Sequence, residues 1–430
     1  PLYREQGTTG RIELTTSPYY HPILPLLVST ATARRCQPDT PLPRTVTLAD
    51  HAYRQLDEGA RSFAGWFGSP PSGLWPSEGS VSPEVLELAA KAGFRWFATD
   101  EDVLAATNSG EPDRGLARIR SWRFDTPAGP VTGVFRNREL SDMIGFRLYR
   151  EVPDVAAELF VRSVRAAARP DSGPEREALV AVILDGENPW EYYEASGWSF
   201  LAELMTRLEA EPGIRMTTIS EALERVSPVP VNGPVHSGSW INGNFRIWIG
   251  HQETNRAWSL LGAAGRVLQD AERNGQVSRE KLAVATRSQL IAEGSDWFWW
   301  YGDDFESDYL DRFDDLFRTH LRNVYSALDL DHPDALDEPV RMDGSGTQWT
   351  PPSVSIRPPL TGKLLNRNGW RGSGTYRGNR RGSAMFMGTS PVRVVRFGGD
   401  GASLFLRLEW SCGLVPDQVT VRISNGHRMQ

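Results

Sequence analysis

The sequence has little cysteine, no long apolar run and no excess of positive charge. Only Cys36 and Cys412 occur among 430 residues, far apart, so neither a disulfide framework nor a zinc knuckle is expected and a reducing cytoplasm fits. No stretch approaches the roughly 18 apolar residues of a membrane span, and the start lacks the basic-then-apolar pattern of a signal peptide. The net charge of −7 repels a phosphate backbone. We therefore expect a cytoplasmic protein that binds neither membranes nor nucleic acid.

Histidine is scarce as well. The seven histidines include no pair at metal-ligand spacing, so neither a metal ion nor another cofactor is expected. The chain opens at Pro1 and enters a strand-like segment within about ten residues. We expect a preceding strand, and any leader, to lie outside the sequence given.

Tryptophan, in contrast, is abundant. The chain has 15 Trp residues. Flat apolar rings suit the C–H faces of sugars, so a surplus outside the core is typical of a carbohydrate cleft. A Trp-rich core explains the composition equally well, and both interpretations stay open here.

The first half of the chain alternates short apolar runs with amphipathic stretches, a pattern that predicts βα units up to residue 228. The predicted strands are residues 10–15, 94–98, 133–136 and 178–184. The predicted helices include 82–92, capped by Ser82, and 152–168. Successive units of this kind imply a parallel sheet, open or closed into a barrel, with chemistry at the carboxyl ends of its strands.

The character changes after a linker at residues 227–238. Helices are predicted at 255–273, 278–292 and 309–328, which indicates a helical unit. From about residue 336 the chain alternates polar and apolar residues at 392–397, 403–409 and 418–423, which predicts a β-rich unit that is cut short at Gln430. A chain of 430 residues exceeds the usual size of one core, in agreement with two or three units.

Two carboxylates occupy positions that suit catalysis. Glu78 lies in the Gly- and Pro-rich turn 73–80, beside Trp75, and Asp185 directly follows the apolar strand 178–184. An exposed stray glutamate and a capping or ion-pairing aspartate are the structural alternatives. Retaining glycoside cleavage needs two carboxyl groups about 5–5.5 Å apart, one to attack the anomeric carbon and one to transfer a proton. The pair fits that requirement if the fold brings both residues together.

Three further segments carry side chains that suit sugar binding, each with a structural alternative. Five aromatic residues, 297–301, follow Asp296, and they either face a cleft or form a packing joint between the barrel and the helical unit. His21 follows the strand 10–15, where a lone histidine is more often structural. Residues 239–253 interleave Trp, Asn and His, which suits carbohydrate and a helix cap equally.

These segments together resemble the motifs of glycoside hydrolase family 57. Residues 10–24, 75–78, 185–187 and 295–304 resemble the second to fifth motifs of that family, in order, over most of the chain. Ser77 stands between Pro76 and Glu78, whereas the commoner form reads Trp-x-Pro-Glu. The first motif, a strand with a His-Gln-Pro triplet, is absent, as expected if the chain begins after it.

The resemblance implies an α/β fold with three parts. These are an incomplete (β/α)7 barrel at residues 1–228 that lacks its first strand, a helical domain at 229–335 that completes the active site, and a C-terminal β-rich domain at 336–430.

The resemblance also implies a retaining enzyme that acts on α-glucans, of the α-amylase, 4-α-glucanotransferase or branching type, with Glu78 as nucleophile and Asp185 as general acid/base. Hydrolysis and transglycosylation stay undecided. The residues then expected to bind the sugar are Glu13, His21, Trp75, Glu187, Trp190, Trp240, Asp296, Trp297 and Trp300.

Two other classes of function compete with this one. The first is a metal-dependent mannosidase or polysaccharide deacetylase on a related barrel, which bound zinc would reveal. The second is a glycan-binding protein without turnover, in which replacing Glu78 or Asp185 leaves the biological effect intact.

Overall fold

The structure is a computed structural model of the chain. It describes residues 2–107, 114–168, 177–302, 304–305, 307, 309–341, 349–358, 370, 372–377 and 392–410. The chain divides into two compact units, the first formed by Pro1–Gly302 with Asp308–Arg341 and the second by Asp303–Ser307 with Met342–Gln430. The boundary predicted near residue 229 lies inside the first unit, so separate barrel and helical domains stay a prediction.

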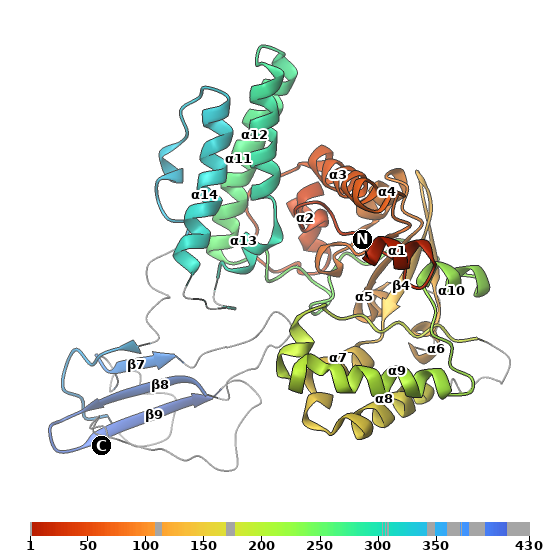
Figure 1. Cartoon of the computed structure of the whole chain (residues 1–430). Helices are drawn as coiled ribbons and strands as arrows, with labels where there is room; N and C mark the ends of the chain where they lie inside the picture. The colour runs from red at the N-terminus through yellow and green to blue at the C-terminus, as the bar shows by residue number, and fades with distance from the viewer. Residues whose placement is uncertain are drawn as a thin grey trace. The chain divides into compact units, whose positions relative to one another are not determined.

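The first unit contains helices on both sides of a small sheet (Figure 1). Its helices are α1 (Leu2–Thr8), α2 (Leu24–Val28), α3 (Ala49–Phe67), α4 (Pro83–Lys91), α5 (Glu101–Ala106), α6 (Arg114–Ala117), α7 (Arg138–Phe146), α8 (Pro153–Ala167), α9 (Trp198–Ala210), α10 (Ile219–Arg225), α11 (Gln252–Asn274), α12 (Arg279–Ala292), α13 (Ser295–Trp299) and α14 (Leu310–Ala327). Its strands are β1 (Gly73–Leu74), β2 (Trp96–Asp100), β3 (Trp122–Thr126), β4 (Gly129–Arg136) and β5 (Val229–Pro230).

The five strands pair in the order β1-β2-β4-β3-β5. The pairs β1/β2, β2/β4 and β3/β5 are parallel, while β3 and β4 form an antiparallel hairpin. The strands at 94–98 and 133–136 are confirmed as β2 and β4. The parallel-stranded α/β character is therefore as predicted, but the described strands make a mixed sheet with β1 and β5 at its ends, and a (β/α)7 barrel is not confirmed.

Two predicted strands are reduced to single bridges, so those predictions are wrong in extent. Residues 10–15 follow α1 and a turn at Gly10, and only the next residue, Thr16, pairs, with Leu74. In the segment 178–184 only Ala181 pairs, with Arg136. The reason is that β3 already occupies this edge of β4 up to Gly133, so only the last residues of β4 can accept another neighbour.

The helices form where their caps and periodicity predict them. Ser82 and Ser278 each accept a hydrogen bond from the backbone N–H three residues on, and these bonds start α4 and α12. Gly275 ends α11 in the left-handed conformation, at φ 64°. The long predicted helices near 152–168, 255–273 and 309–328 are confirmed as α8, α11 and α14.

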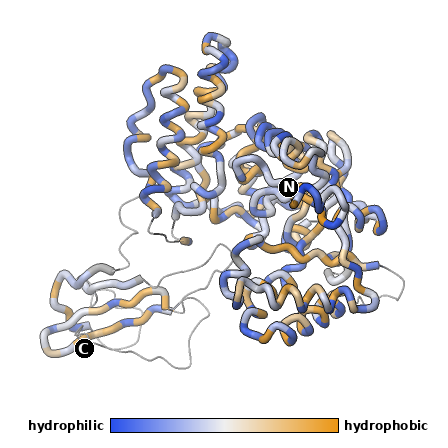
Figure 2. Tube along the Cα trace, viewed as in Figure 1, coloured by the Kyte–Doolittle hydropathy of each residue, from blue (hydrophilic) through white to orange (hydrophobic). Residues whose placement is uncertain are grey.

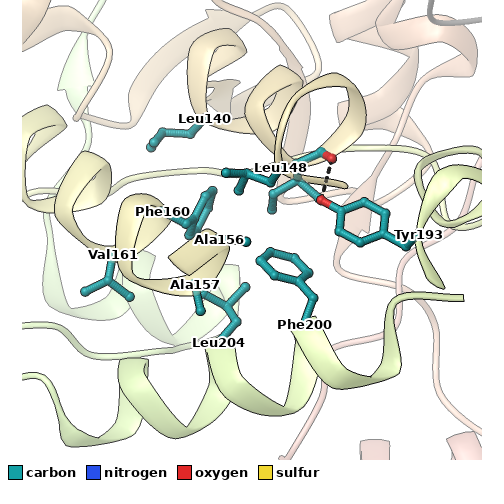
Figure 3. Packing of buried hydrophobic residues seen from close by; sticks show 10 residues of the cluster. Leu140, Leu148, Ala156, Ala157, Phe160, Val161, Tyr193, Phe200 and Leu204 are labelled. Atoms are coloured by element: carbon teal, nitrogen blue, oxygen red, sulfur yellow. Dashed lines mark hydrogen bonds between the residues drawn. The ribbon is translucent and has the colours of Figure 1, made fainter. Parts of the chain in front are cut away.

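A local hydrophobic core joins α7, α8 and α9 (Figure 3). Phe160, Phe200 and Leu204 pack in its centre, each no more than 3% exposed. The hydroxyl of Tyr193 donates a 2.7 Å hydrogen bond to the carbonyl of Ile144, the dashed line in Figure 3. Partly buried Val180, Val182 and Leu184 pack against this core, which therefore supports the segment 178–184.

Helices α11, α12 and α14 run side by side (Figure 1). Polar and apolar residues alternate along each of them (Figure 2), as amphipathic helices in a bundle require. Trp258 of α11 stacks on Phe298 of α13 with ring centroids 4.4 Å apart, and Phe298 meets Phe317 of α14 edge-on. The fully buried Trp residues in this bundle show that part of the tryptophan surplus belongs to the core.

The second unit holds an antiparallel sheet in the order β6-β7-β8-β9, which bears out its β-rich character. Its strands are β6 (Trp349–Thr350), β7 (Gly374–Arg377), β8 (Val392–Gly399) and β9 (Leu404–Trp410). The predictions at 392–397 and 403–409 are confirmed, while 418–423 and Cys412 lie outside the described residues. Across the described part of the chain, no helix combines the length and apolar character that crossing a membrane requires.

Candidate active site

Glu78 sits in a tight turn just after β1, in a backbone conformation that few residues other than glycine adopt. Its φ and ψ are 56° and 27°, and the next residue, Gly79, also has a positive φ of 59°. Such strained positions persist where the surrounding structure holds them, and they cluster at functional sites. The indole Nε1 of Trp240 donates a 2.8 Å hydrogen bond to Glu78 Oε2, and the Trp240 N–H donates to the Glu78 carbonyl at 3.1 Å. Trp240 therefore fixes both the backbone and the carboxylate of Glu78.

The turn is enclosed by aromatic rings. Trp75 meets Trp240 edge-on with ring centroids 5.2 Å apart. A side chain at Gly79 would be crowded, because an added Cβ would lie 3.2 Å from the Trp75 ring and 3.3 Å from the Trp240 Cβ. Thr99 at the end of β2 donates a hydrogen bond to the Gly79 carbonyl. The structure thus brings Trp75, Trp240 and Glu78 together, as predicted.

The Glu78 carboxyl holds its proton to an unusually high pH. Its pKa is raised to about 7: burial raises it most, the Trp240 hydrogen bond lowers it, and the negative charges of Asp185 and Asp296 raise it. Nearby negative charges raise the pKa of a carboxyl group in this way. Asp185 and Asp296, which come from separate parts of the chain, are therefore the charged groups that face Glu78.

This arrangement makes the stability of the protein depend on pH at Glu78. Because the pKa rises from 4.5 to about 7 on folding, the folded state holds a proton between these values that the unfolded state releases. The free energy of unfolding should fall by about 3 kcal/mol as pH rises through that window. Glu78→Gln removes this term, so we expect the variant to match the wild type at pH 4.5 and to exceed its stability by up to about 3 kcal/mol at pH 8, measured by urea unfolding.

Glu84→Gln is the control for that experiment. Glu84 lies six residues further on and pairs with Arg35, which holds the pKa of Glu84 below its usual range. Neutralising it should give no gain in stability at pH 8. Equal stabilisation by both variants would contradict the assignment of the effect to Glu78.

Asp185 follows the segment 181–184. This segment lies beside the last residues of β4, on the edge that β3 occupies only as far as Gly133. The Asn137 N–H donates to the Ala181 carbonyl at 2.8 Å. Arg136 Nε donates to the Ile183 carbonyl at 2.8 Å, and the Ile183 N–H donates to Ser141 Oγ at 3.1 Å. These bonds hold the segment although it forms only one bridge, and they place partly buried Asp185 at the carboxyl end of β4.

His21 and Asp296 belong to two segments that contact each other, because His21 binds Ser295, the residue before Asp296. His21 has a positive φ of 58°, and its Nδ1 shares a 2.9 Å hydrogen bond with Ser295 Oγ, at the start of α13. The Ser295 N–H donates to the His21 carbonyl at 3.0 Å. Burial lowers the pKa of His21 and the charge of Asp296 raises it, so that the net shift is downward. His21 is therefore a neutral hydrogen-bonding group at pH 7.

A buried polar cluster holds this loop contact in place. His51 of α3 donates a 2.6 Å bond from Nδ1 to Glu293, and neither side chain is more than 1% exposed. Gln55 Nε2 donates to the second oxygen of Glu293 at 2.9 Å, and Gln55 Oε1 accepts from the Tyr20 N–H at 3.0 Å. The cluster therefore connects the residue before His21 with the residue two positions before Ser295.

Three residues predicted to bind the sugar have surroundings that do not include Glu78 in the contacts described. Glu13 accepts hydrogen bonds from the Ser220 N–H and hydroxyl and from the Trp96 indole, contacts that attach the start of α10 to the start of β2. Glu187 is exposed and precedes a 3₁₀ turn. Trp190 packs against the core of α7, α8 and α9, with its ring 5.5 Å from Tyr193. The structure thus does not bring these residues to Glu78, and their roles in sugar binding stay predictions.

The aromatic run 297–301 packs chiefly on helices α11 and α14, so these contacts support neither a cleft wall nor a joint with the barrel. Trp297 donates to the Ile291 carbonyl at 2.8 Å, and its ring lies against α14, 6.1 Å from Phe313. The Trp300 ring is 5.7 Å from Phe313. Among the predicted members of this segment, Asp296 is the one whose charge acts on Glu78. The expectation that Trp297 approaches the sugar has no support in these contacts.

Residue Arg136 was missed by sequence reasoning. It ends the predicted strand 133–136, where the rule that chemistry gathers at the carboxyl ends of strands would have drawn attention to it. Ser295 was missed because its partner, His21, is 274 residues away. In the described ranges, no group of three or more His, Cys, Asp or Glu side chains could hold a metal ion.

The family model for glycosyl hydrolase family 57 matches residues 1–233, more than half of the chain, including both Glu78 and Asp185. The chain belongs to glycosyl hydrolase family 57. It is therefore a glycoside hydrolase by family, and the resemblance seen in its motifs is confirmed. A search of curated proteins found no match.

Three solved structures share the fold of this chain. A GH57 branching enzyme from Thermococcus kodakaraensis has 20% identity and a TM-score of 0.58, over 76% of this chain and 67% of that one. An α-amylase from Thermotoga maritima has 15% identity and a TM-score of 0.54, over 76% and 69%. A 4-α-glucanotransferase from Thermococcus litoralis has 16% identity and a TM-score of 0.53, over 75% of this chain and 49% of that one. At these identities the likeness shows a shared fold.

Proposed function

We propose that this family 57 protein cleaves or transfers α-glucosidic bonds with retention of configuration, with Glu78 as nucleophile and Asp185 as general acid/base. The observation that supports the proposal is the placement of the two residues after parallel elements of one sheet. Glu78 follows β1, Asp185 follows the segment bridged to the end of β4, and β1 and β4 both pair with β2 in parallel. The charge of Asp185 also raises the pKa of Glu78. A pair of carboxyl groups at one sugar-sized site is what retaining glycoside cleavage requires.

The reaction follows in two displacements. The Glu78 carboxylate attacks the anomeric carbon, the bond from that carbon to the leaving oxygen breaks, and the Asp185 carboxyl gives its proton to that oxygen. The Asp185 carboxylate then takes a proton from water or from an acceptor sugar hydroxyl. The oxygen so activated attacks the anomeric carbon and releases Glu78. Water as acceptor gives hydrolysis, and a sugar hydroxyl gives transfer.

The other residues of the site have roles that follow from their chemistry. Trp240 holds the Glu78 carboxylate by a hydrogen bond, and the Trp75 and Trp240 rings offer apolar surface to a sugar face. His21, neutral at pH 7 and fixed by Ser295, can exchange hydrogen bonds with a sugar hydroxyl.

An α-glucan is the proposed substrate because the chain belongs to family 57 and the proteins with this fold include a branching enzyme, an α-amylase and a 4-α-glucanotransferase, which share that substrate class. The test is incubation of the protein with maltooligosaccharides and with glycogen, followed by sizing of the products. Shorter products indicate hydrolysis, redistributed lengths indicate transfer, and new branch points indicate branching. No change in either substrate, with protein that is shown to be folded, would contradict the proposal.

The raised pKa of Glu78 predicts the acid limb of the pH profile. A nucleophile must be ionised, so kcat/KM should decrease about tenfold per pH unit below the Glu78 pKa of about 7. We expect the rate on a short maltooligosaccharide to rise with pH through this range for as long as Asp185 keeps the proton that it must donate. An acid limb with a midpoint near pH 4.5, the ordinary value for a glutamate, would contradict the burial of this carboxylate as described.

A further inference from the structure

Arg136 contacts one residue on the way to each of the two proposed catalytic carboxylates, namely Trp240 beside Glu78 and Ile183 before Asp185. It is the last residue of β4 and is 4% exposed. Its guanidinium donates to Asp100 at 3.0 Å and to Asp142, while Nε donates to the Ile183 carbonyl at 2.8 Å. Its Cζ lies 5.5 Å from the centroid of the Trp240 ring.

Two of these contacts lead directly to the site. Trp240 is the residue that donates to Glu78 Oε2, so the guanidinium supports the donor of the nucleophile. Ile183 lies two residues before Asp185, so the Nε bond fixes the segment that delivers the acid/base. The buried carboxylate of Asp100 compensates the charge of the guanidinium in the interior.

We propose that Arg136 is a positioning residue that sets the separation of the two carboxylates, by holding Trp240 over Glu78 and the segment 181–184 before Asp185. The proposal rests on the proposed function. It does not require Arg136 to touch the substrate.

Arginine suits this task better than lysine. The guanidinium is a planar fork with five donors, so it can bind Asp100, Asp142 and the Ile183 carbonyl at once while its face meets an indole. Lysine has one compact ammonium group and cannot keep all these directions. A displacement of about 1 Å at the reacting groups is enough to reduce the rate about 100-fold.

Arg138 provides a matched control. It also pairs with Asp100, at 2.6 Å, and with Asp102, but its contacts do not include Trp240 or Ile183. Arg136→Met and Arg138→Met therefore both remove a cation from Asp100, and only the first removes support from the site. Arg136→Lys keeps a positive charge beside Asp100 and serves as the second variant if Arg136→Met does not fold.

The rate experiment compares these variants at a temperature where urea or thermal unfolding shows each to be folded. We expect Arg136→Met and Arg136→Lys to lower kcat about 100-fold with a smaller change in KM, and Arg138→Met to lower kcat less than about threefold. An equal fall in kcat for the Arg136 and Arg138 variants would overturn the proposal.

The pH profile separates positioning from a general loss of structure. Glu78 faces Trp240, Asp185 and Asp296, and the Trp240 bond lowers its pKa. Weakening that bond, as in Trp240→Phe, should move the acid limb of kcat/KM to higher pH. Arg136→Met should move it in the same direction, and Arg138→Met should leave it in place. The double variant Arg136→Met/Trp240→Phe should lose less than the sum of the single effects, because the Trp240–Glu78 bond contributes to both.

The outcomes distinguish the two proposals. If Glu78→Gln keeps wild-type turnover, the proposed function fails and this proposal fails with it. If Glu78→Gln is inactive but the Arg136 variants keep the acid limb and the kcat of the Arg138 control, only the positioning role is overturned.

Discussion

Glu78→Gln is expected to lower turnover of α-glucans by about 10³-fold or more. The amide cannot act as a nucleophile, yet its carbonyl oxygen can still accept the hydrogen bond that Trp240 donates to Glu78. The fold should therefore survive, and the loss should appear in kcat. The measurement is the initial rate of reducing-end release or chain transfer from a maltooligosaccharide, at pH 8, where Glu78 is ionised.

A control from the same region separates chemistry from packing. Glu84→Gln removes a carboxylate of α4 that pairs with Arg35 at the surface, and we expect a rate within about twofold of the wild type. Glu78→Gln with more than a tenth of wild-type activity would contradict the assignment of the nucleophile.

The division of labour between the two carboxylates can be tested by chemical rescue. Azide added to Glu78→Ala, with a glucosyl substrate that has a good leaving group, should attack the anomeric carbon directly and give a β-glucosyl azide from an α-substrate. Azide added to Asp185→Ala should instead replace water in the second displacement and give the α-azide. The reverse pattern of products would exchange the roles, so that Glu78 is the proton donor and Asp185 the nucleophile.

Glu293→Ala is expected to reduce the free energy of unfolding by about 3–5 kcal/mol. Glu293 is 1% exposed and accepts bonds from His51 and Gln55, both fully buried, so removing it leaves these groups unpaired in the interior. The loss should be measured by urea unfolding at pH 6 and again at pH 9.

The two pH values test the electrostatic part of that prediction. Burial lowers the pKa of His51, but the charge of Glu293 raises it above its usual value, and the net shift is upward. The stability that this pair contributes is complete below the ordinary histidine pKa and is lost as pH rises through the raised one. The effect of Glu293→Ala should therefore be larger at pH 6 than at pH 9.

Glu272→Ala is the control for Glu293→Ala, because Glu272 also pairs with a residue of α3. Glu272 pairs with Arg54 of α3 at 3.3 Å, but both side chains are about one-third exposed, so we expect a loss of no more than about 1 kcal/mol. A similar small loss for Glu293→Ala would mean that the buried cluster does not hold α3 to the end of α12.

The parts of the candidate site that depend on local sequence could be located along the chain, whereas the contacts that depend on packing could not. The turn around Glu78 was visible because Gly, Pro and a carboxylate follow one another, and a strand end at Asp185 was visible as an apolar run that stops. The partners of Trp190, Trp297 and Trp300 could not be predicted, because an aromatic ring suits a cleft and a core equally well and only the neighbours in space distinguish them.

Along the chain alone, caps, glycine stops and periodicity determined the helices α4, α8, α11, α12 and α14, and four motifs in order identified the family, because these signals depend on residues within a few positions of one another. Only the tertiary structure decided which strands pair and which side chains meet. The hairpin partner of β4 limits the segment 178–184 to one bridge, and Ser295 reaches His21 across 274 residues. Such contacts depend on how packed elements compete for the same neighbour, and that competition leaves no local trace in the sequence.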